Sequence, residues 1–440
     1  MSNQQKQWGA IIVMIALFAM IAFVTNLCSP MAIIVKNDFG ASNVLAQIGN
    51  YGNFIAYLVM GIPAGMIIAK IGYKKTALLG LVIGIIGILV QWASGHVGKD
   101  YAFLVYLIGA FISGFTMCIL NCVVNPMLNL LGGGGNKGNQ LIQIGGVFNS
   151  SAAVAVYIIM GALIGDAAKA HIADATPALM IALAIFVVAF IVISFTKIEE
   201  PEQAPVDTSL IKFTKIEEPE QAPVDTSLIK GALGYRHFVL GILGIFLYMG
   251  IEVGVPTYIL QFLTSEQGGS MAASTVGLIV AVYWLMMLIG RFVGGAIGAS
   301  VSSRTQITVV STATIVLVLF GMYAPTDWSV NVPAIDWASL TLGWETVPVG
   351  IFAFLLVGLC TSVMWGGIFN MAVEGLGKYT AIASGIFMTM VFGCAVMVAI
   401  QGYVADITGN YMTSYWVVVF CAAYLLFYAL IGSRVSKREE

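Results

Sequence analysis

The chain has 440 residues, of which 59% are hydrophobic and only 9% are charged, and its formal net charge is −2. Soluble domains carry about 25% charged residues. This composition therefore excludes an ordinary soluble protein and indicates an integral membrane protein.

A helix that crosses a bilayer needs about 20 apolar residues, and twelve stretches of the chain meet this criterion. The first has no small-residue cleavage site close behind it, so we expect a retained helix and not a removed signal peptide. The predicted helices cover residues 9–34, 43–69, 75–95, 101–131, 140–165, 175–196, 235–263, 271–299, 305–324, 347–373, 379–405 and 411–433.

The positive charges predict the orientation of these helices. With a cytoplasmic N-terminus, the external connections hold only three of the 19 Lys and Arg residues, namely Lys36, Lys99 and Lys169. The other 16 then lie on the cytoplasmic side, as the positive-inside rule requires. We therefore expect a multi-pass protein with both termini in the cytoplasm.

A long polar segment separates the first six predicted helices from the last six. The sequence "FTKIEEPEQAPVDTSLIK" occupies 195–212 and occurs again, unchanged, at 213–230. An old duplication would have diverged, so this one is either very recent or an artefact of cloning. Its Pro, Glu and Gln content predicts a solvated, mostly disordered linker.

We predict three parts: an N-terminal six-helix bundle (1–196), a cytoplasmic linker (197–234) and a C-terminal six-helix bundle (235–440). Six helices in each half make the halves parallel repeats about an axis along the membrane normal. "NPMLNLLG" (125–132) and "NMAVEGLG" (370–377) end the fourth and tenth helices with Asn, Leu and Gly at matching places. This pattern resembles the major facilitator superfamily. The resemblance implies an all-α fold of twelve transmembrane helices, in two bundles related by pseudo-twofold symmetry.

In that architecture the first, fourth, seventh and tenth helices line a central cavity. The fourth carries Asn121, Asn125 and Asn129 on one face, and Pro126 frees backbone carbonyls there. Amides offer donors and acceptors to hydroxyl groups, and Trp365 offers a ring on which a sugar can stack. These residues favour a neutral polyhydroxyl solute, although buried amides also join helices, and that structural alternative stays open for each of them.

Three charged residues near the inner helix ends are candidates for gating. The turn after the second helix resembles a weakened form of the superfamily's signature loop, with Ala69 and Lys70 in place of its usual Asp and Arg. We place Arg291 at the inner end of the eighth helix, as a latch between helices, and expect Glu374 to pair across the same surface. With no Arg or Lys in a helix interior, anionic substrates are disfavoured.

Longer motifs narrow the resemblance to the fucose–galactose–hexose symporter family. "NPMLNLLG", "FNSSAAV" (148–154) and "SVMWGGIFNMAVEGLGKYT" (362–380) resemble its fourth-to-fifth and tenth-to-eleventh helix segments. "YMGIEVGV" (248–255) and "GIPAGMIIAKIGYK" (61–74) resemble its seventh and second helices. The resemblance covers nearly the whole chain. It implies uptake of a monosaccharide across a bacterial inner (plasma) membrane, driven by protons or, in some members, by sodium.

One departure from the family pattern affects the mechanism. Fucose permease carries two acids at positions where this chain has Ser29 and Asn121, so that pair's role in proton handling is not carried over. The resemblance assigns sugar contact to the amides that match. With the residues chosen above, the predicted substrate site consists of Asn26, Asn121, Asn125, Asn149, Glu252, Gln261, Trp365 and Asn370.

Glu252 is the only acid deep in a predicted helix. A charged side chain at the bilayer centre costs about 2.5–3.5 kcal/mol on insertion scales. Burial also makes the neutral form of a carboxyl easier to populate. Our hypothesis is that Glu252 carries the coupling proton or belongs to a sodium site. The alternatives are sugar contact without coupling and a neutral, structural Glu.

The remaining expectations concern chemistry and partners. The three histidines, His96, His171 and His237, lie far apart at predicted loops or helix ends, and we expect no enzyme activity, metal, other cofactor or nucleic-acid partner. A transmembrane proton or sodium gradient is the expected driving force, with a sugar and the lipid bilayer as partners of a monomer. A drug or metabolite antiporter and an uncoupled sugar facilitator remain alternatives.

Overall fold

The computed structural model describes residues 8–25, 43–164, 176–196, 198, 227–271, 273–325, 327–336 and 341–435. At 43–53, 99–100, 154, 156–164, 273–274, 334–336 and 342 the backbone alone is described. The predictions for Asn26 and for most of the linker, including its disorder, fall outside these residues.

The N-terminal half consists of long helices. They are Trp8–Thr25, α2 (Asn43–Ile71), α3 (Tyr73–Ser94), α4 (Lys99–Leu131), α5 (Gly135–Ile164) and α6 (Thr176–Phe195). The second half begins with a short helix, α7 (Ser227–Leu233), which occupies the end of the predicted linker and packs against the C-terminal bundle.

The C-terminal bundle contains more interruptions. Its elements are α8 (Arg236–Thr264), η3 (Glu266–Gly268), α9 (Ala273–Ile297), α10 (Ser303–Tyr323), α11 (Val349–Thr361), α12 (Met364–Val373), η4 (Gly377–Tyr379), α13 (Thr380–Thr389), η5 (Met390–Phe392), α14 (Gly393–Thr408), α15 (Tyr411–Ser414), α16 (Trp416–Phe427) and the π-helical turn η6 (Tyr428–Gly432). Within the described residues, eleven helical stretches are long and apolar enough to cross a membrane. The 30-residue α5 covers the remaining predicted span. The helical membrane fold is confirmed.

The tenth predicted helix is interrupted between α11 and α12. Two adjacent hydroxyl side chains turn back onto the backbone there: Thr361 Oγ1 donates to Gly358 O at 3.1 Å and Ser362 Oγ to Leu359 O at 2.6 Å. Such bonds compete with the helical ladder and bend helices. The interruption lies next to Trp365 and helps to set the direction of the segment that carries it.

A β-hairpin is an addition to the predicted all-α fold. Strand β1 (Ser329–Asp336) pairs with β2 (Thr341–Pro348) in antiparallel register, with Ser329 opposite Pro348. Val332 and Val347 are fully buried, and β1 packs against α9. Alternate residues of a strand face opposite sides, so apolar residues at every second position indicate a strand with one buried face. We had expected this segment to be a connection without secondary structure.

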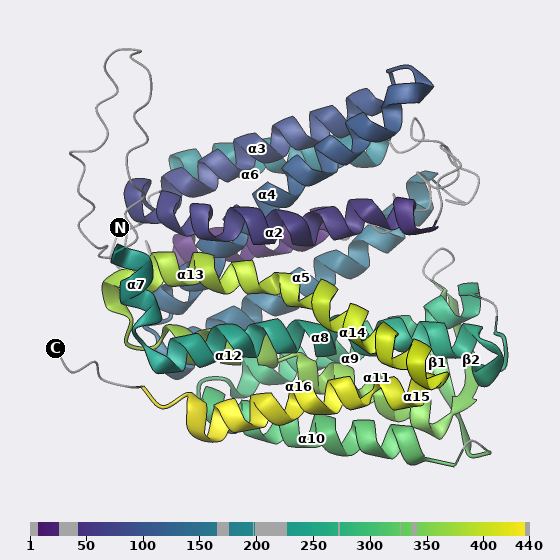
Figure 1. Cartoon of the computed structure of the whole chain (residues 1–440). Helices are drawn as coiled ribbons and strands as arrows, with labels where there is room; N and C mark the ends of the chain where they lie inside the picture. The colour runs from purple at the N-terminus through teal and green to yellow at the C-terminus, as the bar shows by residue number, and fades with distance from the viewer. Residues whose placement is uncertain are drawn as a thin grey trace.

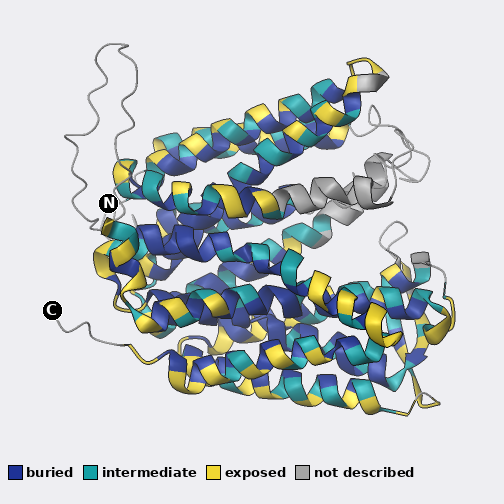
Figure 2. Ribbon diagram, viewed as in Figure 1, coloured by how far each residue is buried: buried dark blue, intermediate teal, exposed yellow. Residues whose placement is uncertain are grey.

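The two halves lie side by side with their helices roughly parallel (Figure 1). The end of α6 and the start of α7 lie at one end of the bundle, here called the linker end, and the hairpin lies at the other. Buried residues gather where the halves meet (Figure 2). In the stretch Val349–Val373, 78% of the most apolar window is buried, whereas the value for Thr176–Phe195 is 28%. The outer helices therefore present the surface suited to lipid.

At the linker end, α13 packs closely against α2 and α4 of the other half. A Cβ atom added to Gly61 would lie 2.7 Å from the Gly385 carbonyl oxygen, so the two backbones meet because side chains are missing. Pro126 has no N–H to offer the Cys122 carbonyl, and Ser384 Oγ donates to that oxygen at 3.1 Å. The predicted freed carbonyl thus joins the halves.

We predict that Gly385→Val separates the halves at the linker end. A Cβ at this position would lie 2.8 Å from Gly65 Cα, and a packed interface cannot absorb that overlap. Spin labels at Lys75 and Lys378, both exposed, should report a longer distance in a cysteine-free background. Gly277→Val is the control, because nothing lies within 4 Å of its added Cβ. An unchanged distance for Gly385→Val would contradict this packing argument.

We also predict that deleting residues 213–230 leaves folding intact. The deletion restores the same junctions and shortens the connection between Thr196 and Ser227 from 30 to 12 residues. Twelve residues still reach about 40 Å, and the change in loop-closure entropy is below about 1 kcal/mol. Thermal unfolding in detergent should give a Tm close to that of the full chain. A fall of more than about 4 °C, roughly 1 kcal/mol, would show that the second copy stabilises the fold.

Candidate functional site

The three asparagines of α4 lie along one helix as predicted, but their side-chain amides already form hydrogen bonds with other groups of the protein. Asn121 Nδ2 donates to the Tyr57 hydroxyl at 2.6 Å and to Met117 O at 3.1 Å. Asn125 Nδ2 donates to the Asn121 backbone oxygen at 3.0 Å and lies 3.3 Å from its Oδ1. Asn121 is 6% exposed and Asn125 is fully buried. In this conformation Asn121 joins α4 to α2, and the amide nitrogen of Asn125 bonds within α4.

Trp365 connects this row to the other half. Its indole Nε1 donates to Asn125 Oδ1 at 3.0 Å. Its ring meets the rings of Tyr248 and Phe387 edge to face, with centroids 6.3 and 6.0 Å apart. The side chain is half-buried, so it still presents surface between the halves. The structure therefore brings the predicted residues Asn125 and Trp365 together.

Asn370, a predicted substrate residue, belongs to a second contact between the halves. Asn129 Nδ2 donates to Asn370 Oδ1 at 2.6 Å, and Asn370 Nδ2 donates to Ser303 Oγ at 2.9 Å. Asn370 is 6% exposed, and both of its polar atoms have protein partners. Substrate contact by Asn370 therefore requires these two hydrogen bonds to break.

Further amides cross between the halves near the linker end and were not among the predicted site residues. They are the bonds from Gln140 Nε2 to Gly295 O at 2.9 Å, from Gln143 Nε2 to Val363 O at 3.0 Å and from Asn139 Nδ2 to Gln306 Oε1 at 3.4 Å. The available signal was the density of amides at the start of α5. That density identifies a polar helix face but not its partners.

Arg291 lies deeper than predicted. It stands six residues before the end of α9 and is 9% exposed. Its Nη1 lies 2.7 Å from Ser150 Oγ, 3.0 Å from Gly146 O and 3.2 Å from Asn149 Oδ1, all on α5 of the other half. The expectation that helix interiors hold no cation is therefore wrong. The latch position between helices agrees with these contacts.

Glu252 is half-buried in the middle of α8. Its carboxyl interacts with the Tyr248 hydroxyl one turn away on the same helix. It also interacts electrostatically with the Arg291 guanidinium. The charge of Arg291, which joins α9 to α5, therefore acts on the carboxyl of Glu252 in α8, a relation that the sequence did not predict.

Asn149 and Gln261, two other predicted substrate residues, are not brought into contact with Asn125 or Trp365. Asn149 Nδ2 donates to Phe18 O at 2.9 Å, so Asn149 positions Arg291 and the first helix. Gln261 follows Glu252 by nine residues, or about 13 Å of helix rise. The structure does not bring Gln261 to Trp365 or Asn125.

Lys70 and Glu374, predicted to gate, both have exposed side chains at the linker end. The Glu374 backbone oxygen lies 2.8 Å from His237 Nε2 within the same half. Nearby, Lys74 Nζ donates to Ser194 O at 2.9 Å and Thr196 O at 2.8 Å, which holds the end of α6. Gating by Lys70 and Glu374 stays a prediction.

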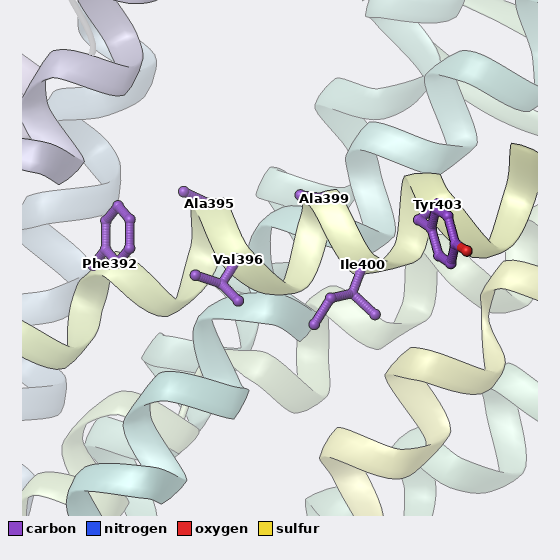
Figure 3. Close-up of a pocket in the computed structure, with 6 residues that line it drawn as sticks. All are labelled: Phe392, Ala395, Val396, Ala399, Ile400 and Tyr403. Carbon is purple, nitrogen blue, oxygen red and sulfur yellow. The ribbon is translucent and has the colours of Figure 1, made fainter.

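Among the described residues, no group of three His, Cys, Asp or Glu side chains is placed to hold a metal ion. A shallow hollow runs along one face of α14 (Figure 3) and is lined by Phe392, Ala395, Val396, Ala399, Ile400 and Tyr403. Its lining is apolar apart from one phenol, so it offers little to a polar solute.

Comparisons with known proteins agree with this architecture. The chain is 29% identical to the glucose/galactose transporter of Brucella abortus over 98% of this chain and 96% of that protein. It is 19% identical to the L-fucose-proton symporter of Escherichia coli over 96% and 92% of the two chains. The structure of FucP in the outward conformation superposes with a TM-score of 0.76 at 20% identity, covering 95% of this chain and 97% of that one.

The family model described as Major Facilitator Superfamily matches residues 13–395. A match of this extent covers most of the N-terminal half, the C-terminal half as far as the start of α14, and the contacts that join the halves. The chain belongs to the Major Facilitator Superfamily.

Proposed function

We propose that this protein imports a neutral monosaccharide by alternating access, as a proton-coupled monomer in a bacterial inner membrane. The observation that carries the proposal is the cluster between the halves: two amides, Trp365 and one carboxyl, Glu252. The relative named glucose/galactose transporter matches 98% of the chain. That match supports a hexose as the solute.

The orientation follows from charge. Lys70, Lys74, Lys75, Lys137, Lys230, Arg236, Arg304, Lys378 and Arg434 all stand at or beyond helix ends at the linker end. The positive-inside rule makes this the cytoplasmic end. The contacts of α13 with α2 and of Arg291 with α5 close that end. The described conformation therefore corresponds to a state closed toward the cytoplasm, and the superposed FucP structure is named as outward.

The chemistry of the cluster suits a sugar better than an anion. A half-buried indole offers a flat apolar face, while amides and Tyr248 offer hydrogen-bonding groups to hydroxyls. Arg291 acts electrostatically on Glu252 of this cluster, but its hydrogen bonds go to three neutral oxygens of α5. An anionic substrate would have to displace these bonds.

The neighbourhood of Glu252 favours a proton over sodium. A sodium ion bound at the carboxylate would be repelled by the guanidinium charge of Arg291. A proton neutralises the carboxyl and leaves one positive charge in the cluster. We therefore assign the coupling role to proton uptake by Glu252 from outside and release to the cytoplasm.

We predict that Glu252→Gln separates exchange from accumulation. The amide has the shape of the protonated acid but cannot release a proton, so sugar counterflow should persist while accumulation driven by a pH gradient disappears. The measurement is uptake of labelled glucose and galactose into proteoliposomes, with Glu266→Gln, an exposed acid of the same half, as the control. Full accumulation by Glu252→Gln would remove Glu252 from the coupling role. No sugar transport by the unaltered protein would remove the proposed function.

We predict that Trp365→Ala weakens sugar binding by about 2- to 13-fold, the range for losing an aromatic contact worth about 0.5–1.5 kcal/mol. Trp365→Phe keeps a ring but loses the Nε1 donor, so its loss should be smaller. Binding is measured by isothermal titration calorimetry on purified protein, because tryptophan fluorescence would itself change when Trp365 is replaced. Trp284→Ala is the control, because this residue is 41% exposed. Equal affinities for Trp365→Ala and Trp284→Ala would show that the ring does not contact the sugar.

A further inference from the structure

We propose that His237 is a sensor of cytoplasmic acid, which supports the closed cytoplasmic side while it is neutral and releases it when it takes up a proton. This inference rests on the alternating access of the proposed function and adds a control from the cytoplasmic side. His237 is the second residue of α8, at the linker end, and its side chain is fully buried. Neither the sugar site nor the coupling step uses it.

The imidazole of His237 joins the start of α8 to the end of α12. Its Nε2 lies 2.8 Å from the backbone oxygen of Glu374, the residue that follows α12. A carbonyl oxygen can only accept, so Nε2 carries the hydrogen and donates it. The hydroxyl of Tyr428 in η6 donates to the His237 backbone oxygen at 3.3 Å. Three elements of the C-terminal half therefore meet at this histidine.

The other ring nitrogen has no partner. Among the described residues, five buried side-chain polar atoms lack a hydrogen-bond partner, and His237 Nδ1 is the one of these that takes up a proton near neutral pH. With the hydrogen on Nε2, Nδ1 is an acceptor only. Protonation turns it into a donor without an acceptor and adds a buried positive charge, and both changes are strongly unfavourable. The observed position therefore suits the neutral form alone.

The groups around the ring indicate where a charged His237 would turn. Neighbouring tyrosines are neutral at physiological pH; they are Tyr235 beside it, Tyr424 of α16 and Tyr428 of η6. The charged residues of the neighbouring elements, all with exposed side chains, are Lys230 of α7, Arg236, Arg304 of α10 and Glu374. Of these, the Glu374 carboxylate is the one that favours an imidazolium. A charged ring gains by turning toward water and this carboxylate, which breaks its bond to the Glu374 backbone oxygen.

The bond that breaks lies between two contacts that close the cytoplasmic side. Four residues before Glu374, the side chain of Asn370 accepts from Asn129 of the other half at 2.6 Å. After Glu374 the chain turns through Gly375, whose φ is 74°, and leads into α13, where Ser384 donates to a backbone oxygen of α4 at 3.1 Å. Release of the Glu374 oxygen frees the turn that sets the position of α13. The closed state then loses support on both sides of the turn.

The sign of the pH effect follows from this arrangement. The closed state binds fewer protons at His237 than the open state, so acid favours opening and alkali favours closure. A histidine in water becomes charged as the pH falls below about 6.5, and the ratio of open to closed molecules then rises by at most about tenfold per pH unit. Under the proposed function each sugar brings a proton inward. A cytoplasm that acidifies would hold the protein open to the inside and slow its return.

The test follows the cytoplasmic gate with pH by spin labels at Lys75 and Lys378 of the full chain, both exposed at the linker end. The background is cysteine-free and carries Glu252→Gln, so that the coupling carboxyl does not titrate. Distances are recorded in lipid at about pH 7.5 and about pH 5.5, a window in which histidine is the side chain that ordinarily changes its charge.

The chain has three histidines, His96, His171 and His237, and two matched variants separate them. His237→Gln keeps the other two, whereas the double variant His96→Gln with His171→Gln keeps His237 alone. In the background and in the double variant we expect the ratio of long to short distances to rise by up to about tenfold from pH 7.5 to 5.5. His237→Gln keeps an amide donor for the Glu374 oxygen but does not titrate, so its distances should not respond to pH. His237→Phe removes the donor and should give longer distances at both pH values.

Several results would overturn the sensor. They are a background distribution that is the same at both pH values, an equal pH response in His237→Gln, and short distances retained by His237→Phe at both pH values. If His237→Gln does not fold, the double variant decides, because an unchanged distribution in a chain whose single histidine is His237 overturns the proposal. Sugar exchange by the unaltered protein is measured separately. Its absence would remove the proposed function, whereas the response of the gate to pH is judged from the labels.

Discussion

The structure depends on a contact between two halves that must be tight enough to seal and weak enough to open. In a membrane, apolar surfaces gain little by leaving lipid, so packing and hydrogen bonds hold helices together. Hydrogen bonds across the halves between neutral groups come from Asn129, Asn139, Gln140, Gln143, Trp365 and Ser384. At about 0.6 kcal/mol each, these six give about 4 kcal/mol. Moving a two-state equilibrium from 1:99 to 99:1 takes about 5.5 kcal/mol. The free energy of these hydrogen bonds is therefore of the same order as the free energy that shifts the protein between a closed and an open state.

Neutral amides suit this task for a second reason. A salt bridge that breaks in a low dielectric leaves two uncompensated charges, whereas an amide that loses its partner can bond to water or to a solute hydroxyl. The contact between α2 and α13 is similar in kind, because Gly61 and Gly385 approach through backbone and leave no polar group buried when they part. Among the hydrogen bonds between the halves in the described part of the chain, the charged donor is Arg291, whose acceptors on α5 are neutral oxygens.

Much of this fold could be predicted from the sequence, because bilayer thickness dictates helix length and every span reads as an apolar run. Pro126 predicted a free carbonyl, and the Cys122 oxygen is indeed taken by another helix. A lone acid stands out in an apolar run, so Glu252 could also be identified from the sequence as a candidate functional residue. The partners of the amides were not, since Asn129 and Asn370 are separated by 241 residues and meet only through the packing of the halves. The burial of Arg291 was missed although the bounds of its helix were predicted to within two residues, because a long side chain near a helix end can extend to water or into the protein, and only the packing of α5 against α9 decides which.

The same amides appear in both the predicted site and the observed seal, and this overlap has a mechanistic meaning under the proposed function. Asn125 Oδ1 accepts from the Trp365 indole across the halves, and Asn125 Nδ2 is already bonded to Asn121. A sugar hydroxyl that donates to Asn125 Oδ1 competes with that indole donor and loosens one contact of the seal. Substrate binding then lowers the cost of opening by about the free energy of the bond it replaces. A solute without hydroxyls could occupy the space but would leave the seal intact, so the polarity of the site selects the solute by its ability to replace a gate contact.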